Sequence, residues 1–233
     1  VLIGTDETKG SHVPVHWERA VESLKRQVLS LGGRVEECLR LAVRAFLERD
    51  VETARRLIEG DTDLDLREVE IEEECLKLLA LYHPVAGDMR FVVAILKLNN
   101  DLERIGDLAV NIAELTLEWD RPAGGHSAEL ARMAEQTQTL LKKALDALVH
   151  RNAILAHEVR QADDVIDEFQ RRAEERLHEA VREGRADRVE ALVAEWNAAH
   201  QLERVADHAT NIAEDVIYLV EGRIVRHHPE PEK

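Results

Sequence analysis

The sequence is poor in aromatic residues, in cysteine and in basic charge. Only 3% of its 233 residues are Phe, Trp or Tyr. The sequence has 31 Lys and Arg residues but 47 Asp and Glu residues, which gives a net charge of −16. Nucleic-acid binding needs Lys and Arg gathered on one face, so we expect no nucleic-acid partner. The two cysteines, Cys38 and Cys75, are typical of small buried hydrophobic positions in a reducing compartment.

Long apolar runs are also missing. The longest runs from Phe91 to Leu98 and is interrupted by Lys97, whereas a membrane-spanning helix needs about 20 apolar residues. The segment from Val1 to Pro14 has neither the basic start nor the apolar stretch of a secretory signal. We therefore expect a cytoplasmic protein.

Common catalytic signatures are not found either. The sequence has no Gly-x-x-x-x-Gly-Lys-Ser/Thr phosphate loop, no Gly-x-Ser-x-Gly elbow and no Cys-x-x-Cys pair. The expectation is a protein that is not an enzyme.

Helical periodicity dominates what is present. Apolar residues recur at intervals of three and four, which predicts an all-α fold. Chain breakers divide it into six long helices in two groups of three, and a Pro/Gly-rich stretch at 120–125 separates the groups. The predicted helices span residues 15–48, 51–81, 87–118, 127–150, 153–182 and 186–221. Helices of this length with short turns predict two tandem, pseudo-symmetric up-down-up three-helix bundles, as domains at 15–119 and 126–222.

An internal repeat supports the two-bundle interpretation. The segment Leu-Glu-Arg-Ile-Gly-Asp-Leu-Ala-Val-Asn-Ile-Ala-Glu at 102–114 matches Leu-Glu-Arg-Val-Ala-Asp-His-Ala-Thr-Asn-Ile-Ala-Glu at 202–214 at nine of thirteen positions. A weaker match relates 61–65 to 163–167, where aspartates recur four residues apart. Repetition at this period indicates two copies of one three-helix unit.

Both repeated segments carry pairs of carboxylates. Residues four apart share one face of a helix, so each pair places like charges side by side, and a bound cation relieves that repulsion. If the second and third helices of each bundle face each other, four carboxylates converge, which suits cations with oxygen ligands and allows more than one ion. The candidate metal ligands are Asp61, Asp65, Glu103, Asp107, Asp163, Asp167, Glu203 and Asp207.

Two simpler interpretations stand beside metal binding. Acidic pairs four residues apart are common on solvated faces, and Arg104 and Arg204 could neutralise their neighbours without metal. The occurrence of all four pairs at equivalent places in two diverged copies favours metal. His200 and His208 stand where the first copy has Asn100 and Leu108, and they are left out of the ligand set although either could add a nitrogen ligand.

The repeated segments at 102–114 and 202–214, with the Pro84-Val85-Ala86-Gly87-Asp88-Met89-Arg90 entry to the third helix, resemble the PhoU family of phosphate-uptake regulators. The resemblance covers roughly residues 15–221. It implies two similar three-helix bundles, a homodimer, and multinuclear clusters of iron, zinc or similar ions held by the paired acidic motifs named above. The second copy lacks the Pro-x-x-x-Asp-x-Arg entry, so a role for Arg90 would belong to one bundle.

The resemblance also implies a function. It suggests a non-enzymatic negative regulator of phosphate-starvation signalling, which links a phosphate ABC transporter to a sensor histidine kinase and reaches the membrane through these partners only. One alternative is a carboxylate-bridged di-metal protein of ferritin-like type with a redox or storage role. That chemistry needs Glu-x-x-His on two helices, and the sequence offers this spacing only at Glu175 to His178. A helical module without metal is the other alternative.

Overall fold

The computed structural model describes residues 15–118 and 127–225, which form seven α-helices and no strand. The helices are α1 (Val15–Glu48), α2 (Val51–Glu59), α3 (Thr62–Tyr82), α4 (Ala86–Glu118), α5 (Ala128–His150), α6 (Ala153–Arg182) and α7 (Ala186–Glu221). The all-α prediction is confirmed. The predicted link at 120–125 lies outside the described residues.

The prediction of one continuous helix over 51–81 is wrong. The chain breaks after Glu59, where the Gly60 N–H bonds to the carbonyls of Arg56 and Leu57 and ends α2. Glycine is a poor helix former because ordering it costs much backbone entropy. Helix α3 then begins at Thr62, so Asp61 lies at its N-terminus instead of in a helix interior.

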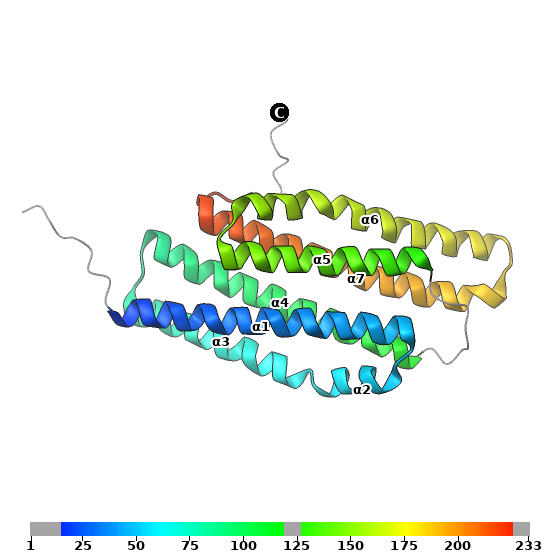
Figure 1. The fold of residues 1–233 in the computed structure, drawn as a ribbon, viewed down its shortest axis with the longest axis horizontal. Helices are drawn as coiled ribbons and strands as arrows, with labels where there is room; N and C mark the ends of the chain where they lie inside the picture. Colours follow the sequence, from blue (N-terminus) through cyan, green and yellow to red (C-terminus); the bar gives the residue numbers. More distant parts are fainter. Residues whose placement is uncertain (1–14, 119–126, 226–233) are drawn as a thin grey trace, which may run out of the picture.

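The helices run along one long axis in two groups (Figure 1). Helices α1 to α4 lie on one side of the molecule and α5 to α7 on the other. The two helices that carry the repeated motif, α4 and α7, are the third long helices of their groups and pack against each other. The motif copies therefore meet at the centre of the molecule.

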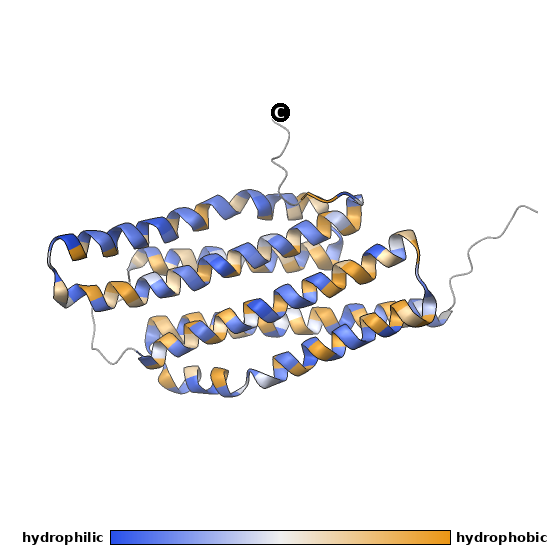
Figure 2. Cartoon of the chain, turned by 180° about the vertical axis from the view of Figure 1, so that it is seen from behind, coloured by the Kyte–Doolittle hydropathy of each residue, from blue (hydrophilic) through white to orange (hydrophobic). Residues whose placement is uncertain are grey.

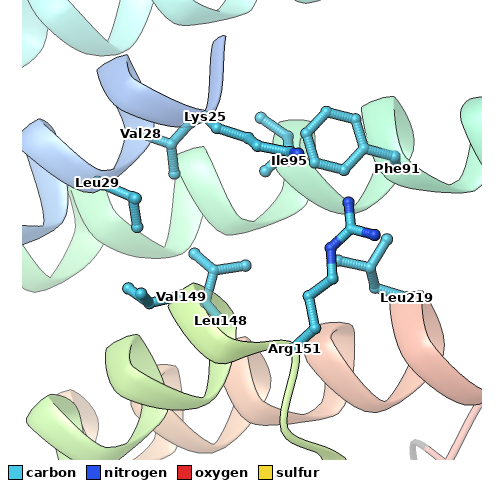
Figure 3. A pocket seen from close by; sticks show the side chains of 9 residues that line it. All are labelled: Lys25, Val28, Leu29, Phe91, Ile95, Leu148, Val149, Arg151 and Leu219. Carbon is cyan, nitrogen blue, oxygen red and sulfur yellow. The ribbon is translucent and has the colours of Figure 1, made fainter. Parts of the chain in front are cut away.

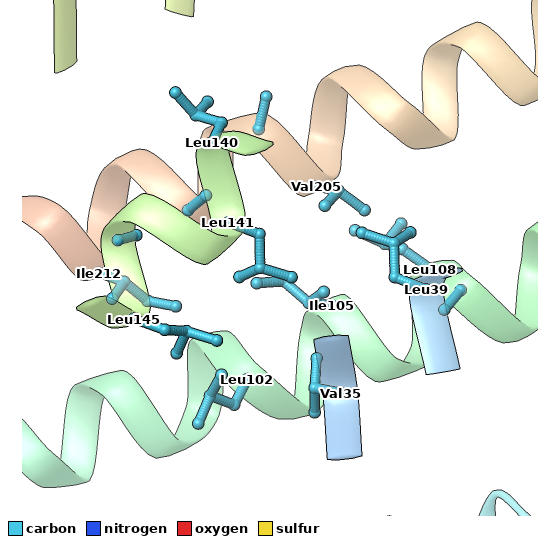
Figure 4. Close-up of a cluster of buried hydrophobic side chains, with 14 of the residues drawn as sticks. Val35, Leu39, Leu102, Ile105, Leu108, Leu140, Leu141, Leu145, Val205 and Ile212 are labelled. Carbon is cyan, nitrogen blue, oxygen red and sulfur yellow. The ribbon is translucent and has the colours of Figure 1, made fainter. Parts of the chain in front are cut away.

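A single hydrophobic cluster extends through both groups. Figure 4 shows Val35 of α1 and Ile105 of α4 near Leu141 of α5 and Val205 of α7. Leu102, Ile105, Val205 and Ile212 are each at most 2% exposed. Burial of a side chain of this size contributes about 1.5–3 kcal/mol, so this shared core fixes the position of α4 relative to α7.

Polar contacts between α4 and α7 come in two equivalent sets, because Asp101 corresponds to Gln201 and Asn111 to Asn211 in the repeat. Buried Asp101 lies 2.8 Å from Nδ1 of His208 and 3.4 Å from the Asn211 amide, while the Asn111 amide donates to the Gln201 side chain. The histidine without a counterpart in the first copy therefore joins the two bundles.

Arg90 makes a contact that joins the two bundles. Gly222 ends α7 with a left-handed φ of 74°, and a Cβ at this position would collide with the Arg90 guanidinium. A guanidinium at a helix C-terminus interacts favourably with the helix dipole. Arg90 therefore packs the start of α4 onto the end of α7.

Gly32 allows α1 to approach α5. The helix is unbroken at Gly32 and Gly33, and a Cβ on buried Gly32 would lie 3.0 Å from Cδ2 of Leu145, whereas a Cβ on Gly33 would meet nothing within 4 Å.

None of the described helices is long and apolar enough to cross a membrane.

The two adjacent glycines give a matched pair of substitutions. Gly32→Leu forces a larger side chain against Leu145 and should lower the free energy of unfolding by about 1–3 kcal/mol. Gly33→Leu should raise it by up to about 1 kcal/mol because leucine is the better helix former. Equal effects of the two substitutions in urea denaturation would contradict the packing described here.

Candidate metal centre

The first group of predicted ligands converges where α3 begins beside the middle of α4. Asp61 and Asp65 come from the first turns of α3, and Asp107 comes from the repeated motif on α4. Each offers a carboxylate oxygen, and the three oxygens lie within 4.8 Å of one another. Glu103 stands one turn before Asp107 on α4 and is half-buried.

The burial and mutual repulsion of the carboxylates in this cluster favour the binding of protons or cations. Partial burial raises the pKa of Asp61, and the charges of Asp65, Asp107 and Glu114 raise it further. Burial also raises the pKa of Glu103, with Asp107 as the next cause. Both carboxylates are less stable as anions than they would be in water.

Two acidic residues outside the predicted set belong to this cluster. Glu68 adds to the raised pKa of Glu103, and its side chain accepts a hydrogen bond of 2.9 Å from Asn99. Glu114 contributes to the raised pKa of Asp61. Glu68 follows Asp65 by three residues, which is a helical neighbour spacing, but comparison of the copies hides it because Gln170 stands at the equivalent place.

The neutralising role considered for Arg104 is partly realised. Its guanidinium lies 3.3 Å from Glu103 and 3.4 Å from Asp107, and its side chain is 52% exposed. An exposed pair of this kind contributes at most about 1 kcal/mol. Arg104 therefore reduces the repulsion without removing it.

The second cluster lies between α6 and α7. Burial raises the pKa of Asp163 to about 6, with the charges of Asp207 and Asp167 as further causes. The pKa of Glu203 rises to about 7 through burial and through the charges of Asp207, Asp167 and Asp163. One carboxylate oxygen of Asp163 is buried without a hydrogen-bond partner.

The two clusters differ in their packing. Among the described residues, Asp61, Asp65 and Asp107 form the group of three possible ligands whose oxygens lie within 4.8 Å of one another, so the oxygens of the second quartet are farther apart. Glu214 of the second copy pairs with Arg160 at 3.3 Å. Its equivalent Glu114 adds its charge to the first cluster instead.

The two histidines left out of the ligand set have different surroundings. Nδ1 of His200 lies 3.7 Å from the Glu203 carboxylate and 3.3 Å from the Gln170 amide, so His200 borders the second cluster. His208 is engaged with Asp101 of the first bundle.

The cysteines are not suited to metal ligation at neutral pH. Both are free thiols, and burial raises the pKa of Cys38 to about 11 and that of Cys75 to about 12. A thiol binds metal as the thiolate, so each would have to lose a proton that it holds firmly. Cys38 and Asp61 both line an open hollow of about 340 Å³ between α1 and α2.

A smaller cavity of about 80 Å³ lies between the two bundles (Figure 3). Lys25 and Arg151 lie 5.7 and 5.9 Å from the centre of the Phe91 ring, and apolar side chains form the other walls. No carboxylate lines this cavity, so it is no candidate for a cation.

The raised pKa values predict an unusual pH dependence for the metal-free protein. Asp163 and Glu203 hold protons up to about pH 6 and 7 when folded, but release them near pH 4 when unfolded. The folded state therefore binds more protons over this range, and the free energy of unfolding should fall as the pH rises from about 4 to 7. The expected loss is roughly 1–2 kcal/mol after solvent screening.

Urea denaturation in the presence of a chelator, at several pH values, measures this effect. The variant with Asp163→Asn and Glu203→Gln should lose less stability over the same range. An identical pH dependence in the variant would show that these two groups do not cause it.

Comparison with known proteins identifies the family. The model of the PhoU domain matches residues 28–116 and 130–216, which contain the two copies of the repeated motif. The chain is 37% identical over 211 residues to a phosphate-specific transport system accessory protein PhoU homolog of Thermotoga maritima, covering 90% of each chain. It is 30% identical over 218 residues to the Escherichia coli protein PhoU, covering 93% of this chain and 90% of that one.

Solved structures agree with this match. The crystal structure of PhoU from Pseudomonas aeruginosa has a TM-score of 0.81 at 35% identity, covering 89% of this chain and all of that one. The phosphate transport system regulatory protein PhoU from Streptococcus pneumoniae has a TM-score of 0.82 at 28% identity, covering 90% of this chain and 99% of that one. Two matched repeats and the identity over nine-tenths of the sequence show that this chain belongs to the PhoU family.

Proposed function

We propose that the protein is a non-catalytic regulator of phosphate uptake and phosphate-starvation signalling that binds metal ions at its two carboxylate clusters. Family membership supports the role in phosphate regulation, since the relatives are described as accessory proteins of the phosphate-specific transport system. The convergence of Asp61, Asp65 and Asp107 is the observation that carries the metal-binding part.

The residues present fit a bound cation. Three oxygens lie within 4.8 Å of one another, neighbouring carboxylates have raised pKa values, and one oxygen of Asp163 is buried without a partner. The carboxylates of each cluster repel one another, and a divalent or trivalent ion between them would be attracted to all of them. Oxygen ligands suit ions such as iron. The proposed ligands are Asp61, Asp65, Glu103 and Asp107 in one bundle and Asp163, Asp167, Glu203 and Asp207 in the other, with zinc as an alternative ion.

A bound metal ion would stabilise the arrangement of the helices and would not take part in a reaction. An ion that ties α3 to α4 fixes the surface that these helices present to a partner. We propose a phosphate ABC transporter and a sensor histidine kinase as those partners, with the regulator keeping starvation signalling off when phosphate is plentiful. A homodimer is part of this proposal, and sedimentation equilibrium tests it.

The ferritin-like alternative finds no support in the geometry. Its chemistry needs Glu-x-x-His ligands that point into a bundle core. Glu175 and His178 are exposed on α6, and the Glu175 carboxylate is paired with Arg171. These side chains point away from the place where a di-iron site would have to lie.

Metal titration tests the ligand assignment. Calorimetry with Mn²⁺ or Zn²⁺ should show binding to the metal-free protein, and the melting temperature should rise because the ion binds the folded state. The variant with Asp61→Asn and Asp107→Asn should lose the first site, and the variant with Asp163→Asn and Asp207→Asn the second. The control variant, with Glu135→Gln and Glu174→Gln at exposed positions, removes as much charge and should bind like the wild type. Unchanged stoichiometry in the cluster variants would contradict the assignment.

Deletion of the gene tests the regulatory role. Cells without the protein should express phosphate-starvation genes even in high phosphate, and a plasmid copy should restore repression. Phosphate-responsive expression that does not change on deletion would contradict the role, whatever the metal titrations show.

A further inference from the structure

Helix α3 has an apolar stripe on the face that points away from the core. Leu66, Val69 and Leu76 are 60%, 46% and 53% exposed, and their spacing places them within an arc of about 80° at ~100° per residue. The core residues of the same helix, Ile71 and Cys75, lie on the opposite face. We call these three exposed residues the α3 stripe.

The second copy shows that the bundle does not require this stripe. With the offset that relates Asp61 to Asp163, the equivalent residues on α6 are Glu168, Arg171 and His178. All three are polar, and Glu168 pairs with Arg171 at 2.6 Å. In Figure 2, α6 at the top is mostly hydrophilic, whereas hydrophobic bands run along α3 at the bottom. The same position in the fold is therefore a solvated face in one copy and an apolar face in the other.

Acidic residues lie beside and within the stripe, because at ~100° per residue Glu70 and Glu72 flank its arc and Glu73 falls inside it. Glu70, Glu72 and Glu73 are exposed, and within the described residues none of them forms an ion pair. The neighbouring cation, Lys77, is already engaged with Glu74 at 3.1 Å. The stripe is thus an apolar strip that Glu73 interrupts and that Glu70 and Glu72 border.

The negative charge of these glutamates limits which kind of partner can bind to the stripe. A second copy of the chain would place acidic residues against acidic residues, and an anionic membrane surface would be repelled in the same way. A helix with an apolar face and basic flanks satisfies both features, because its leucine-like anchors cover the stripe and its Lys or Arg residues meet the glutamates.

We propose that the α3 stripe docks a basic amphipathic helix of a partner protein. The inference deepens the proposed adaptor function and rests on it, since it names the surface and the partner chemistry. Asp65 immediately precedes Leu66, so a cation at the first cluster would hold the end of the docking surface in place.

Peptide binding tests the surface directly. The probe is a labelled helical peptide of about 20 residues with leucine anchors and lysine flanks, and its matched control has glutamate in place of lysine. Fluorescence anisotropy should show binding of the lysine peptide only. The variant with Leu66→Glu, Val69→Arg and Leu76→His copies the residues of α6 and should weaken binding roughly tenfold or more.

A second triple variant controls for charge and exposure. Ile154→Glu, Val193→Arg and Val181→His make equivalent changes at other exposed apolar positions and should leave binding unchanged. Equal loss of binding in both triple variants, or no binding of the lysine peptide to the wild type, would overturn the α3 stripe as the docking surface.

Capture of the proposed partners separates this inference from the adaptor function. Wild-type protein should retain the transporter ATPase or the histidine kinase, and the α3-stripe variant should not. Retention by both would overturn the stripe and leave the adaptor function intact, whereas retention by neither would overturn the adaptor function. Loss of self-association or of binding to anionic vesicles in the variant would instead assign the stripe to a second copy or to a membrane.

Discussion

Repulsion among carboxylates that the helix packing holds together is the constraint on which the functional account depends. Asp61, Asp65 and Asp107 cannot separate freely, because α3 and α4 are packed on a common core. Burial raises the pKa values of Asp61, Asp163 and Glu203, and the charges of the neighbouring carboxylates raise them further. A protein that keeps such groups in both of its copies stores unfavourable electrostatic free energy, which protons or a metal ion release.

The contact between α4 and α7 makes this constraint possible. Both helices present the repeated motif, with one face toward the shared core and an adjacent face toward the carboxylate clusters. Asp101 and His208 join the helices where the two copies have diverged. The two clusters therefore belong to one scaffold, in which the two copies share the same arrangement of helices. They differ in single residues: Arg160 pairs with Glu214, whereas Glu114 has no such partner among residues 15–118 and 127–225.

Much of this arrangement could be predicted from the sequence, because long helices with short turns leave few alternatives. The periodicity and the repeat indicated the all-α fold and the facing acidic pairs. The break at Gly60 was missed, since a single glycine in a helical pattern does not by itself end a helix. Glu68 was missed because its counterpart is Gln170. The tighter packing of the first cluster depends on helix positions that spacing along the chain does not define.

Anomalous diffraction from crystals grown with Mn²⁺ tests the central claim most directly, because it locates ions without reference to stability or activity. The account predicts anomalous peaks among Asp61, Asp65 and Asp107 and among Asp163, Glu203 and Asp207. Peaks confined to other surfaces of the molecule, with these carboxylates free of metal at saturating Mn²⁺, would contradict it.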